Sequence, residues 1–385
     1  MKKRKICVVV TARPSYSRIR TALKAIAQHS ELELELVVAA SALLERYGSA
    51  IHSIEHDGFP IRARVYMVLE GENLVTSAKS TGIGLSELAT VFDNIGPDAV
   101  VTVADRYETL ATAVAASYMN IPLVHVQGGE VTGSIDEKVR HSVTKLSNLH
   151  LVSTKLAAER VKKLGEDPAT VHVTGCPSID IAAEVAARPQ MDFDPFQKYG
   201  GVGPATDLAK GYLVVMQHPV TTEYDEARHQ VEETLYAVKD FGLPVLWFWP
   251  NPDAGSDGTS KGIRVFREKE NPKNFHLFRN MLPEDFLRLL CGATAIVGNS
   301  SVAIRECSYL GVPAVNIGTR QQGRERGRNV IDVGHDRRDI ADAIATHIRR
   351  GKPERDLLYG DGKAGARIAD CLSRAELTIE KRLTY

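Results

Sequence analysis

Short apolar runs rich in valine and isoleucine alternate with amphipathic segments along the chain. Strands that are buried on both faces read as continuous apolar runs, so this alternation predicts parallel strands joined by crossover helices. In the first half we expect strands at Ile6–Val10, Leu34–Ala39, Ala99–Val103, Leu123–Val126, Leu149–Val152 and Val171–Val173. In the second half we expect strands at Tyr212–Met216, Val245–Phe248, Phe275–Phe278, Ala295–Val297, Ala314–Ile317 and Val330–Val333.

The segments between these runs have the apolar period of helices. We expect helices at Ser17–His29, Leu43–His56, Leu74–Ile95, Tyr107–Met119, Asp136–Leu146, Leu156–Leu164, Ile179–Ala187, Val302–Leu310, Asp339–Arg349 and Gly365–Glu380. Periodicity fades into prolines and glycines between Arg188 and Leu208, a composition that favours connections. We therefore expect a Rossmann-like domain over residues 1–190, a second over 205–360, and a C-terminal helix in 361–385 that crosses back to the first domain.

Composition narrows the possible partners. Lysine plus arginine and aspartate plus glutamate both number 48, so no global charge attracts nucleic acid or an anionic membrane. No apolar stretch approaches the roughly 20 residues that span a bilayer. The basic start followed by Ile6–Val10 imitates a signal peptide, but it lacks a cleavage site and stops at Arg13-Pro14. Five scattered cysteines without paired or zinc-type spacing indicate free thiols, so we expect a cytoplasmic protein.

Polar residues follow several expected strands of the first half, where parallel sheets place ligands. Carboxylates there are candidates for general acid and base catalysis, although any one of them is equally a surface acid. Asp136 is also a plausible helix cap. The candidates are Arg13 and Ser15 after the first strand, Asp105 and Arg106 after the third, Gln127 and Glu130 after the fourth, and Asp136.

The second half carries a candidate phosphate site. Residues 298–301 read Gly-Asn-Ser-Ser between a strand and a helix, an arrangement that offers amides and hydroxyls to a diphosphate, or else a plain serine cap. Glu306 lies further along that helix and is a candidate ligand of ribose hydroxyls. Arg320 begins a glycine-spaced series of arginines that suits phosphate, or else forms a solvated loop. His218 follows the first strand of this half and is either a group that titrates near neutral pH or a packed loop histidine.

At these residues the chain resembles, from end to end, the hydrolysing UDP-N-acetylglucosamine 2-epimerases, which feed sialic acid synthesis. The resemblance lies in residues 104–106, 125–133, 135–141, 175–178, 217–222, 250–256, 298–301, 318–321 and 359–362. It implies the glycosyltransferase-B fold, in which two Rossmann-like domains face each other across a cleft.

The resemblance also implies a two-part reaction on a nucleotide-sugar substrate. The nucleotide diphosphate leaves C1 while the C2 proton is removed, and water then adds to the 2-acetamidoglycal with inversion at C2. Asp105 and Asp136 are implied as acid and base, His218 as the residue over the diphosphate, and Arg13 as a partner of phosphate or sugar. The implied nucleotide and substrate residues also include Ser15, Arg106, Asn251, Ser256, Ser300, Ser301, Glu306 and Arg320. No redox cofactor and no metal are implied, and we expect a homodimer or homotetramer.

Two positions depart from the family. Relatives typically have glutamate, a catalytic acid, where this chain has Gln127, and an acidic residue near the position of Ser15. Since glutamine transfers no proton, either Glu130 or Asp136 replaces the lost acid, or the sugar differs, or the chemistry has changed. The alternatives are a non-hydrolysing 2-epimerase, a glycosyltransferase of the same fold, and a catalytically silent nucleotide-sugar binding protein. The nucleotide is UDP or GDP.

Overall fold

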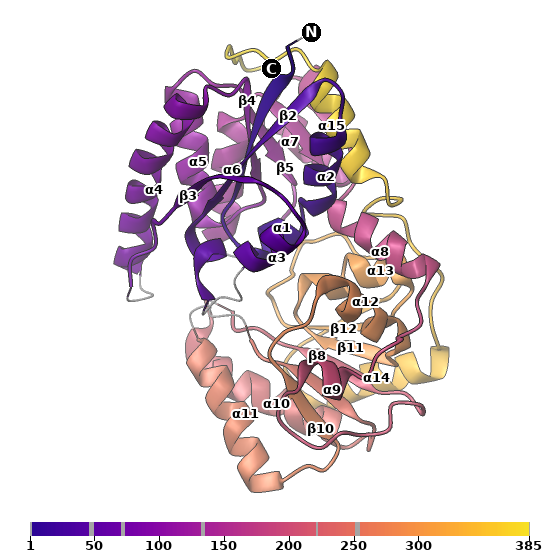
Figure 1. Ribbon diagram of the computed structural model, residues 1–385. Helices are drawn as coiled ribbons and strands as arrows, with labels where there is room; N and C mark the ends of the chain where they lie inside the picture. Colours follow the sequence, from indigo (N-terminus) through magenta and orange to yellow (C-terminus); the bar gives the residue numbers. More distant parts are fainter. Residues whose placement is uncertain are drawn as a thin grey trace. The chain divides into compact units, whose positions relative to one another are not determined.

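The computed structural model describes residues 2–45, 50–70, 74–131, 135–220, 222–250 and 255–384. These residues form two compact α/β units (Figure 1). Unit 1 combines residues 2–131 and 135–180 with the C-terminal residues 359–384. Unit 2 lies between Ile181 and Leu358, so the division falls inside helix α8 (Pro177–Ala187).

Within the described residues, unit 1 has a seven-stranded parallel sheet in the order β3-β2-β1-β4-β5-β6-β7. Every connection crosses over, as in a doubly wound fold. Alternate residues of β1 enter two cores: Ile6, Val8 and Val10 face one side of the sheet, and Cys7 and Val9 face the other. The strands are β1 (Arg4–Val10), β2 (Leu32–Ala39), β3 (Ile61–Val65), β4 (Ala99–Val103), β5 (Leu123–Val126), β6 (Leu149–Val152) and β7 (Val171–Val173).

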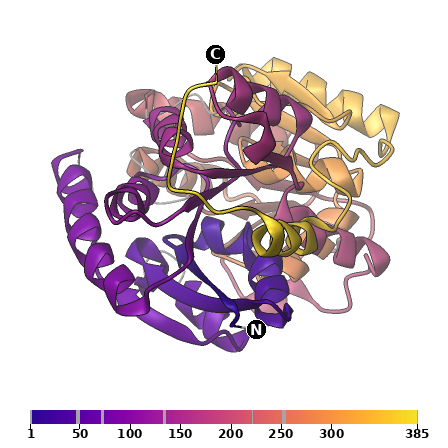
Figure 2. The same cartoon turned by 90° about the horizontal axis from the view of Figure 1, so that it is seen from above.

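Helices cover both faces of this sheet (Figures 1 and 2). They are α1 (Arg13–Ser17), α2 (Arg20–Gln28), α3 (Ala50–His56), α4 (Leu74–Ile95), α5 (Tyr107–Tyr118), α6 (Ile135–Leu146), α7 (Lys155–Lys163), α8 and the C-terminal α15 (Ala364–Arg374), with a 3-10 turn η1 at Ala40–Leu43 and another, η3, at Pro168–Thr170.

Unit 2 repeats the design with a six-stranded parallel sheet, among the residues described, in the order β10-β9-β8-β11-β12-β13. Its strands are β8 (Leu213–Met216), β9 (Val245–Phe248), β10 (Phe275–Phe278), β11 (Ala295–Gly298), β12 (Ala314–Ile317) and β13 (Val330–Val333). Its helices are α9 (Pro195–Tyr199), α10 (Ala227–Lys239), α11 (Ser256–Glu270), α12 (Pro283–Gly292), α13 (Glu306–Leu310) and α14 (Arg337–Arg350), with 3-10 turns η4 at Tyr224–Glu226 and η5 at Ser301–Ala303. The predicted class, two Rossmann-like α/β domains, is confirmed.

The C-terminal segment is an integral part of unit 1. Helix α15 packs along α2, and both views place the two helices side by side (Figures 1 and 2). Asp180 caps α15, because its carboxylate accepts the backbone N–H groups of Ala364 at 2.8 Å and Gly365 at 2.7 Å. A Cβ at Gly365 would lie 2.6 Å from the backbone carbonyl carbon of Thr21 and would collide with it. Glycine therefore allows the close helix packing here.

A buried carboxylate anchors the end of the chain. Glu166 accepts hydrogen bonds from Lys145 at 2.6 Å, from His150 at 3.0 Å, and from Lys381. Burial alone would raise the pKa of Glu166, but the hydrogen bonds from His150, Lys145 and Lys381 outweigh it and lower the pKa to about 2. Three donors from separate segments thus fix the residues after α15 to the rest of unit 1.

Most predicted strands are confirmed, whereas four predicted helices have other bounds. The helix predicted at Ser17–His29 is α2 and begins only at Arg20, because the residues before it form a separate short helix, α1, with Pro14 in its first turn. Within the described part of Leu43–His56 the helix is α3, after the η1 turn, and Val302–Leu310 is η5 followed by α13. Gly365–Glu380 is helical only to Arg374, because Ala375 and Leu377 leave the helix to pack against the core.

The stretch between the sheets of the two units also contains structure that the sequence pattern did not indicate. Helix α9 forms at Pro195–Tyr199, and Val202 pairs with Leu277 of the edge strand β10 through two hydrogen bonds of 2.9 Å. This pairing covers part of an edge that would otherwise present unpaired backbone groups.

Candidate functional site

Two residues at the carboxyl ends of adjacent strands in unit 1 have left-handed backbone conformations. Ala104 follows β4 and Gln127 follows β5, and both have a φ of 67°. Left-handed φ is unfavourable for residues with a Cβ, and such residues concentrate at functional sites. Polar candidates Asp105 and Glu130 flank these positions, so the predicted edge of the sheet has the backbone strain typical of a site.

Asp105 forms a buried ion pair with Arg140 of α6. The side chain of Arg140 is 1% exposed and that of Asp105 is 8% exposed. A guanidinium buried to this degree needs a counter-charge, and Asp105 supplies it. Arg140 was not among the candidate site residues, because its place beside Asp105 depends on how α6 packs against the sheet.

Glu130 is buried next to a closely packed glycine pair. Its carboxylate accepts a hydrogen bond of 3.0 Å from Ser153. A Cβ at Gly128 would lie 2.9 Å from the ring of His125, and one at Gly129 would lie 2.2 Å from the carbonyl oxygen of Ala157. Larger residues at either glycine would therefore displace the loop that carries Glu130.

Gln127 is buried and its side chain points to Cys176. The amide nitrogen donates to the Cys176 sulfur at 2.9 Å, and that sulfur lies 3.0 Å from the hydroxyl of Ser178. The other side-chain atom of Gln127, Oε1, is buried and has no hydrogen-bond partner among the described residues. A buried acceptor in this state is a candidate for binding a donor of the substrate.

The remaining candidates of unit 1 occupy separate places along the same edge. Arg13 begins α1, and burial lowers its pKa from the ordinary value. Ser15 is buried in α1. Arg106 pairs with the fully buried Glu108 at 3.2 Å, which fixes its guanidinium on α5. Asp136 lies in the first turn of α6, where a carboxylate interacts favourably with the helix dipole.

In unit 2, Gly298 turns the chain at the end of β11. It has a φ of 133°, and a Cβ there would lie 2.2 Å from the carbonyl oxygen of Met216 on β8. Only glycine fits both requirements. The turn leads to Ser300, which precedes the η5 turn without a side-chain capping bond. Ser300 thus occupies the N-cap position of η5, but its hydroxyl makes no capping bond.

Asn299 joins three loops of unit 2. Its side-chain oxygen accepts the backbone N–H of His218 at 2.7 Å, and its amide donates to the backbone carbonyl of His218 at 2.8 Å. Its own carbonyl accepts bonds from Arg320 at 3.1 Å and from Gln321 at 2.9 Å. The loops after β8, β11 and β12 are thus held together at one buried residue, which the sequence analysis did not single out.

His218 is buried and neutral. Burial, and to a smaller extent the charge of Arg320, lower its pKa well below the ordinary value. Of the two readings drawn from the sequence, the lowered pKa favours a packed loop histidine over a group that titrates near neutral pH. A neutral imidazole can still donate one N–H to an oxygen of a ligand.

Glu306 begins α13, and its Oε2 atom is buried without a hydrogen-bond partner among the described residues. An acceptor in this state suits a ligand hydroxyl. Ser301 lies at the start of η5, and Ser256 at the start of α11 after Gly255, whose φ is 92°. Asn251, the other predicted substrate residue of this unit, lies outside the described residues.

A second cluster adjoins Arg320. Glu223, at the start of η4, accepts a hydrogen bond of 2.5 Å from the hydroxyl of Thr319 and one of 2.7 Å from Gln230. Gly318 lies against the ring of His335, where a Cβ would be 2.3 Å from Nε2. The segment that carries Arg320 is therefore attached on one side to Asn299 and on the other to Glu223.

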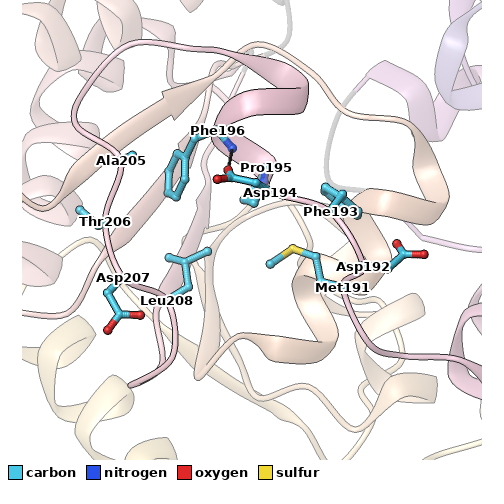
Figure 3. A pocket seen from close by; sticks show the side chains of 10 residues that line it. All are labelled: Met191, Asp192, Phe193, Asp194, Pro195, Phe196, Ala205, Thr206, Asp207 and Leu208. Carbon is cyan, nitrogen blue, oxygen red and sulfur yellow. Dashed lines mark hydrogen bonds between the residues drawn. The ribbon is translucent and has the colours of Figure 1, made fainter.

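An open groove of about 600 Å³ lies apart from these groups, along the stretch that covers β10 (Figure 3). Phe193, Phe196 and Leu208 form apolar parts of its wall, and Asp192 and Asp207 bring carboxylates. None of the described candidate residues lines it. The groove therefore does not belong to the predicted site.

Two classes of feature are missing from the part of the chain that the structure describes. No group of three or more histidine, cysteine, aspartate or glutamate residues there is arranged to hold a metal ion. No helix there is long and apolar enough to cross a membrane.

The chain matches a known family over most of its length. The family described as UDP-N-acetylglucosamine 2-epimerase matches residues 24–373. The UDP-N,N′-diacetylbacillosamine 2-epimerase (hydrolyzing) of Legionella pneumophila is 32% identical, with 97% of each chain covered. The GDP/UDP-N,N′-diacetylbacillosamine 2-epimerase (hydrolyzing) of Campylobacter jejuni is 30% identical over 86% of this chain and 85% of the relative.

A solved structure has the same fold. The UDP-GlcNAc 2-epimerase from Neisseria meningitidis bound to UDP-GlcNAc superimposes with a TM-score of 0.81, covering 96% of this chain and 100% of the other. The sequence identity in this superposition is 17%. The likeness therefore supports the glycosyltransferase-B type of fold.

Proposed function

Since the chain belongs to the UDP-N-acetylglucosamine 2-epimerase family, we propose that it is a hydrolysing 2-epimerase of a nucleotide-activated N-acetyl sugar. The products are a nucleotide diphosphate and a free sugar of the N-acetylmannosamine type. The observation that carries the hydrolysing assignment is the similarity to two relatives named as hydrolyzing, one of them along 97% of both chains. Their names include both UDP and GDP, so both nucleotides are candidates for the leaving group.

The reaction has two balanced parts. First, the bond from C1 to the diphosphate oxygen breaks and a base removes the C2 proton, which leaves a 2-acetamidoglycal. Water then adds to the double bond, with its hydroxyl on C1 and a proton delivered to the opposite face of C2. The chemistry needs a stabilised leaving group and groups that exchange protons beside the sugar.

Unit 1 supplies the proton-transferring groups in this proposal. Asp105 and Asp136 act as acid and base, and Glu130 is the nearest carboxylate in the loop where Gln127 replaces the family's glutamate. The buried ion pair with Arg140 holds the carboxylate of Asp105 in one place, as acid and base catalysis requires.

Unit 2 supplies the nucleotide-binding groups. Ser300, Ser301 and Arg320 bind the diphosphate, and the buried, unpartnered Oε2 of Glu306 accepts bonds from the ribose hydroxyls. Neutral His218 donates an N–H to the departing phosphate oxygen. The proposal requires these groups and the carboxylates of unit 1 to act on the same substrate molecule.

A panel of UDP- and GDP-activated N-acetyl sugars tests the proposal. Each sugar is incubated with the pure protein in D₂O, and free nucleotide diphosphate and sugar are followed by NMR. We expect both products, with deuterium at C2 of the sugar, and no dependence on NAD or on a divalent metal. Loss of activity with a chelator that a divalent ion restores contradicts the metal-free mechanism.

The same experiment separates the alternatives. A new nucleotide sugar without free diphosphate indicates a non-hydrolysing 2-epimerase. Retention of the original C2 hydrogen, with diphosphate released only when an acceptor sugar is added, indicates a glycosyltransferase. Binding without turnover of any substrate indicates a nucleotide-sugar binding protein.

A further inference from the structure

A fully buried histidine of unit 1 has no part in the chemistry described above. His125 belongs to β5 and is 0% exposed. Its Nε2 atom lies 2.8 Å from the carbonyl oxygen of Ala104, and its Nδ1 atom lies 3.1 Å from the hydroxyl of Thr144 on α6. The ring thus joins the end of β4 to the helix α6.

The partners of His125 define its protonation state. A carbonyl oxygen only accepts hydrogen bonds, so Nε2 carries the proton that is donated to Ala104. Burial lowers the pKa of His125 to about 4, despite the opposing effect of the bond to Ala104. The ring is therefore neutral at pH 7, and Nδ1 accepts the hydroxyl hydrogen of Thr144.

Ala104 is the residue that this arrangement constrains. Its φ of 67° is unfavourable for alanine, because the Cβ crowds the following carbonyl oxygen. Two groups of β5 hold it: the carbonyl of Val126 accepts the Ala104 N–H at 3.0 Å, and His125 donates to the Ala104 oxygen. The backbone direction at Ala104 determines where the next side chain, that of Asp105, points.

The contacts form a closed circuit. Asp105 pairs with Arg140, and Arg140 lies four residues before Thr144, so both lie on the same face of α6. Thr144 bonds to His125, and His125 bonds back to Ala104. A change at any member therefore alters the alignment of Asp105 against α6, which also carries Asp136.

We propose that His125 is a positioning residue for the reaction: its imidazole holds Ala104 in the left-handed conformation and so sets Asp105 against Arg140 and α6. This inference rests on the proposed function, since it treats Asp105 as a group that acts on the sugar. His125 itself does not touch the substrate and transfers no proton.

Three variants of the full-length protein test the role of the N–H donor. His125→Leu removes it, His125→Gln keeps an N–H near the position of Nε2, and Thr144→Val removes the bond to Nδ1 with little change of shape. For His125→Leu we expect kcat to fall by about tenfold to a hundredfold, the scale of a small misplacement of a reacting group. UDP affinity, measured by calorimetry, should stay within about twofold, since the nucleotide groups belong to unit 2.

His125→Gln should recover most of the lost kcat, and Thr144→Val should show a smaller loss than His125→Leu. A kcat for His125→Leu close to that of the wild type overturns the proposal. If His125→Leu does not fold, the comparison of His125→Gln with Thr144→Val decides, and equal, wild-type kcat values in both overturn it.

A second substitution separates positioning from general stability. Glycine adopts left-handed φ without the alanine penalty, so Ala104→Gly should restore at least half of the logarithmic loss in kcat when it is added to His125→Leu. Because glycine also relieves strain at this φ, thermal denaturation of the single and double variants is measured beside kcat, so that recovered kcat is distinguished from recovered stability. No recovery in the double variant overturns the proposal.

A crystal structure of His125→Leu keeps this test independent of the proposed function. We expect the φ of Ala104 to leave the left-handed region or Asp105 to separate from Arg140. If the wild type turns over no sugar nucleotide, the proposed function fails, whereas an unchanged Ala104 and Asp105 in the variant overturn the positioning role.

Discussion

Asn299 and His218 exchange two hydrogen bonds, one in each direction between the side-chain amide of Asn299 and the backbone of His218. The distances are 2.7 Å to the His218 N–H and 2.8 Å to its carbonyl oxygen. Both residues are buried, so an amide is the one group of this size that satisfies a donor and an acceptor of the same residue. The side chain of Asn299 thus holds the backbone of His218 in place.

Asn299→Ala should therefore weaken both stability and nucleotide binding. Leaving a buried donor and acceptor without partners costs about 1–3 kcal/mol in the free energy of unfolding, which urea denaturation measures. UDP affinity should fall, because His218 and the loop of Arg320 lose a common support. Asn299→Asp is the matched control: it keeps the acceptor but sets an oxygen against the His218 carbonyl. A folded Asn299→Ala protein with wild-type UDP affinity would contradict this role.

The arginines of the loop after β12 should differ in function. Arg320→Ala and Ser301→Ala should each weaken binding of UDP or GDP by about 1–3 kcal/mol, the scale of a charge-assisted hydrogen bond, as measured by calorimetry. Arg328→Ala is the matched control, because the Arg328 side chain is 74% exposed and makes only a 3.5 Å contact with the exposed Glu354. Equal effects in Arg320→Ala and Arg328→Ala would show that overall loop charge, and not a specific site, attracts the nucleotide.

The structural role of Asp105 can be separated from its proposed catalytic role. Asp105→Asn should lower turnover by about a hundredfold or more, as for other positioned acids and bases. It should also destabilise the protein by about 3–5 kcal/mol, because Arg140 loses its buried counter-charge. Asp105→Asn combined with Arg140→Met should regain stability in urea denaturation but not turnover. Recovery of turnover in the double variant would reduce Asp105 to a structural residue.

Asp136→Asn tests the second carboxylate proposed to exchange protons, which lies in the first turn of α6. We expect a similar loss of turnover, with nucleotide affinity nearly intact. Steady-state kinetics and UDP calorimetry measure the two quantities. Near-normal rates in both the Asp105 and the Asp136 variants would exclude the elimination mechanism.

Gln127→Glu tests the departure from the family pattern. The substitution replaces the amide that donates to Cys176 with a carboxyl group that can carry a proton. We expect turnover of UDP-N-acetylglucosamine to rise relative to the other sugars of the panel. Cys176→Ala removes the same contact without adding an acid and is the control. An equal change of preference in both variants would trace the effect to the lost contact.

The pH dependence of stability should have two separate windows. The pKa of His125 is lowered to about 4 from 6.5, so the unfolded chain takes up the proton first and stability falls as pH decreases from 6.5 to 4. The lowered pKa of His218 has the same sign. The pKa of Glu166 is lowered to about 2 from 4.5, so its contribution is complete above pH 4.5 and is lost between 4.5 and 2.

The pKa shifts of His125 and Glu166 each correspond to a loss of stability on the order of 3 kcal/mol across their windows. Urea denaturation as a function of pH measures the losses. Lys381→Met should reduce the loss in the acid window, because Lys381 donates a hydrogen bond to the Glu166 carboxylate. A stability that is flat from pH 6.5 to 4 would contradict the buried, neutral state of His125.

The sequence predicted the strands more completely than it predicted the residues of the candidate site. Ala99–Val103 and Ala314–Ile317 are mostly apolar runs, each with one polar residue, that form buried interior strands, and their bounds follow from the sequence alone. Strand β3 was missed, because Ile61–Val65 alternates with two arginines and forms a sheet edge with one exposed face. The amphipathic pattern predicted most of the helices. It did not predict that α2 would begin only after Ile19 or that α15 would end at Arg374, because these bounds depend on tertiary packing.

The candidate residues after the strands were identified from position and chemistry, and the backbone strain at Ala104 and Gln127 agrees with that placement. Arg140 and Asn299 were not predicted as site residues, because their roles depend on partners 35 and 81 positions away in the sequence. The lowered pKa of His218 was not predicted either, since it depends on burial rather than on residue type. Contacts of this kind become visible only when the chain is folded.

The division of unit 1 between the two ends of the chain affects how the protein is made. Unit 2 is complete once the ribosome has passed Leu358, whereas unit 1 still lacks α15 and the segment of Lys381. The unit whose first strands are synthesised first is therefore finished last, and α15 can pack on α2 only after all of unit 2 has been synthesised. A C-terminal truncation or fusion should accordingly disturb the unit that carries Asp105, while the unit that carries Arg320 can already have folded.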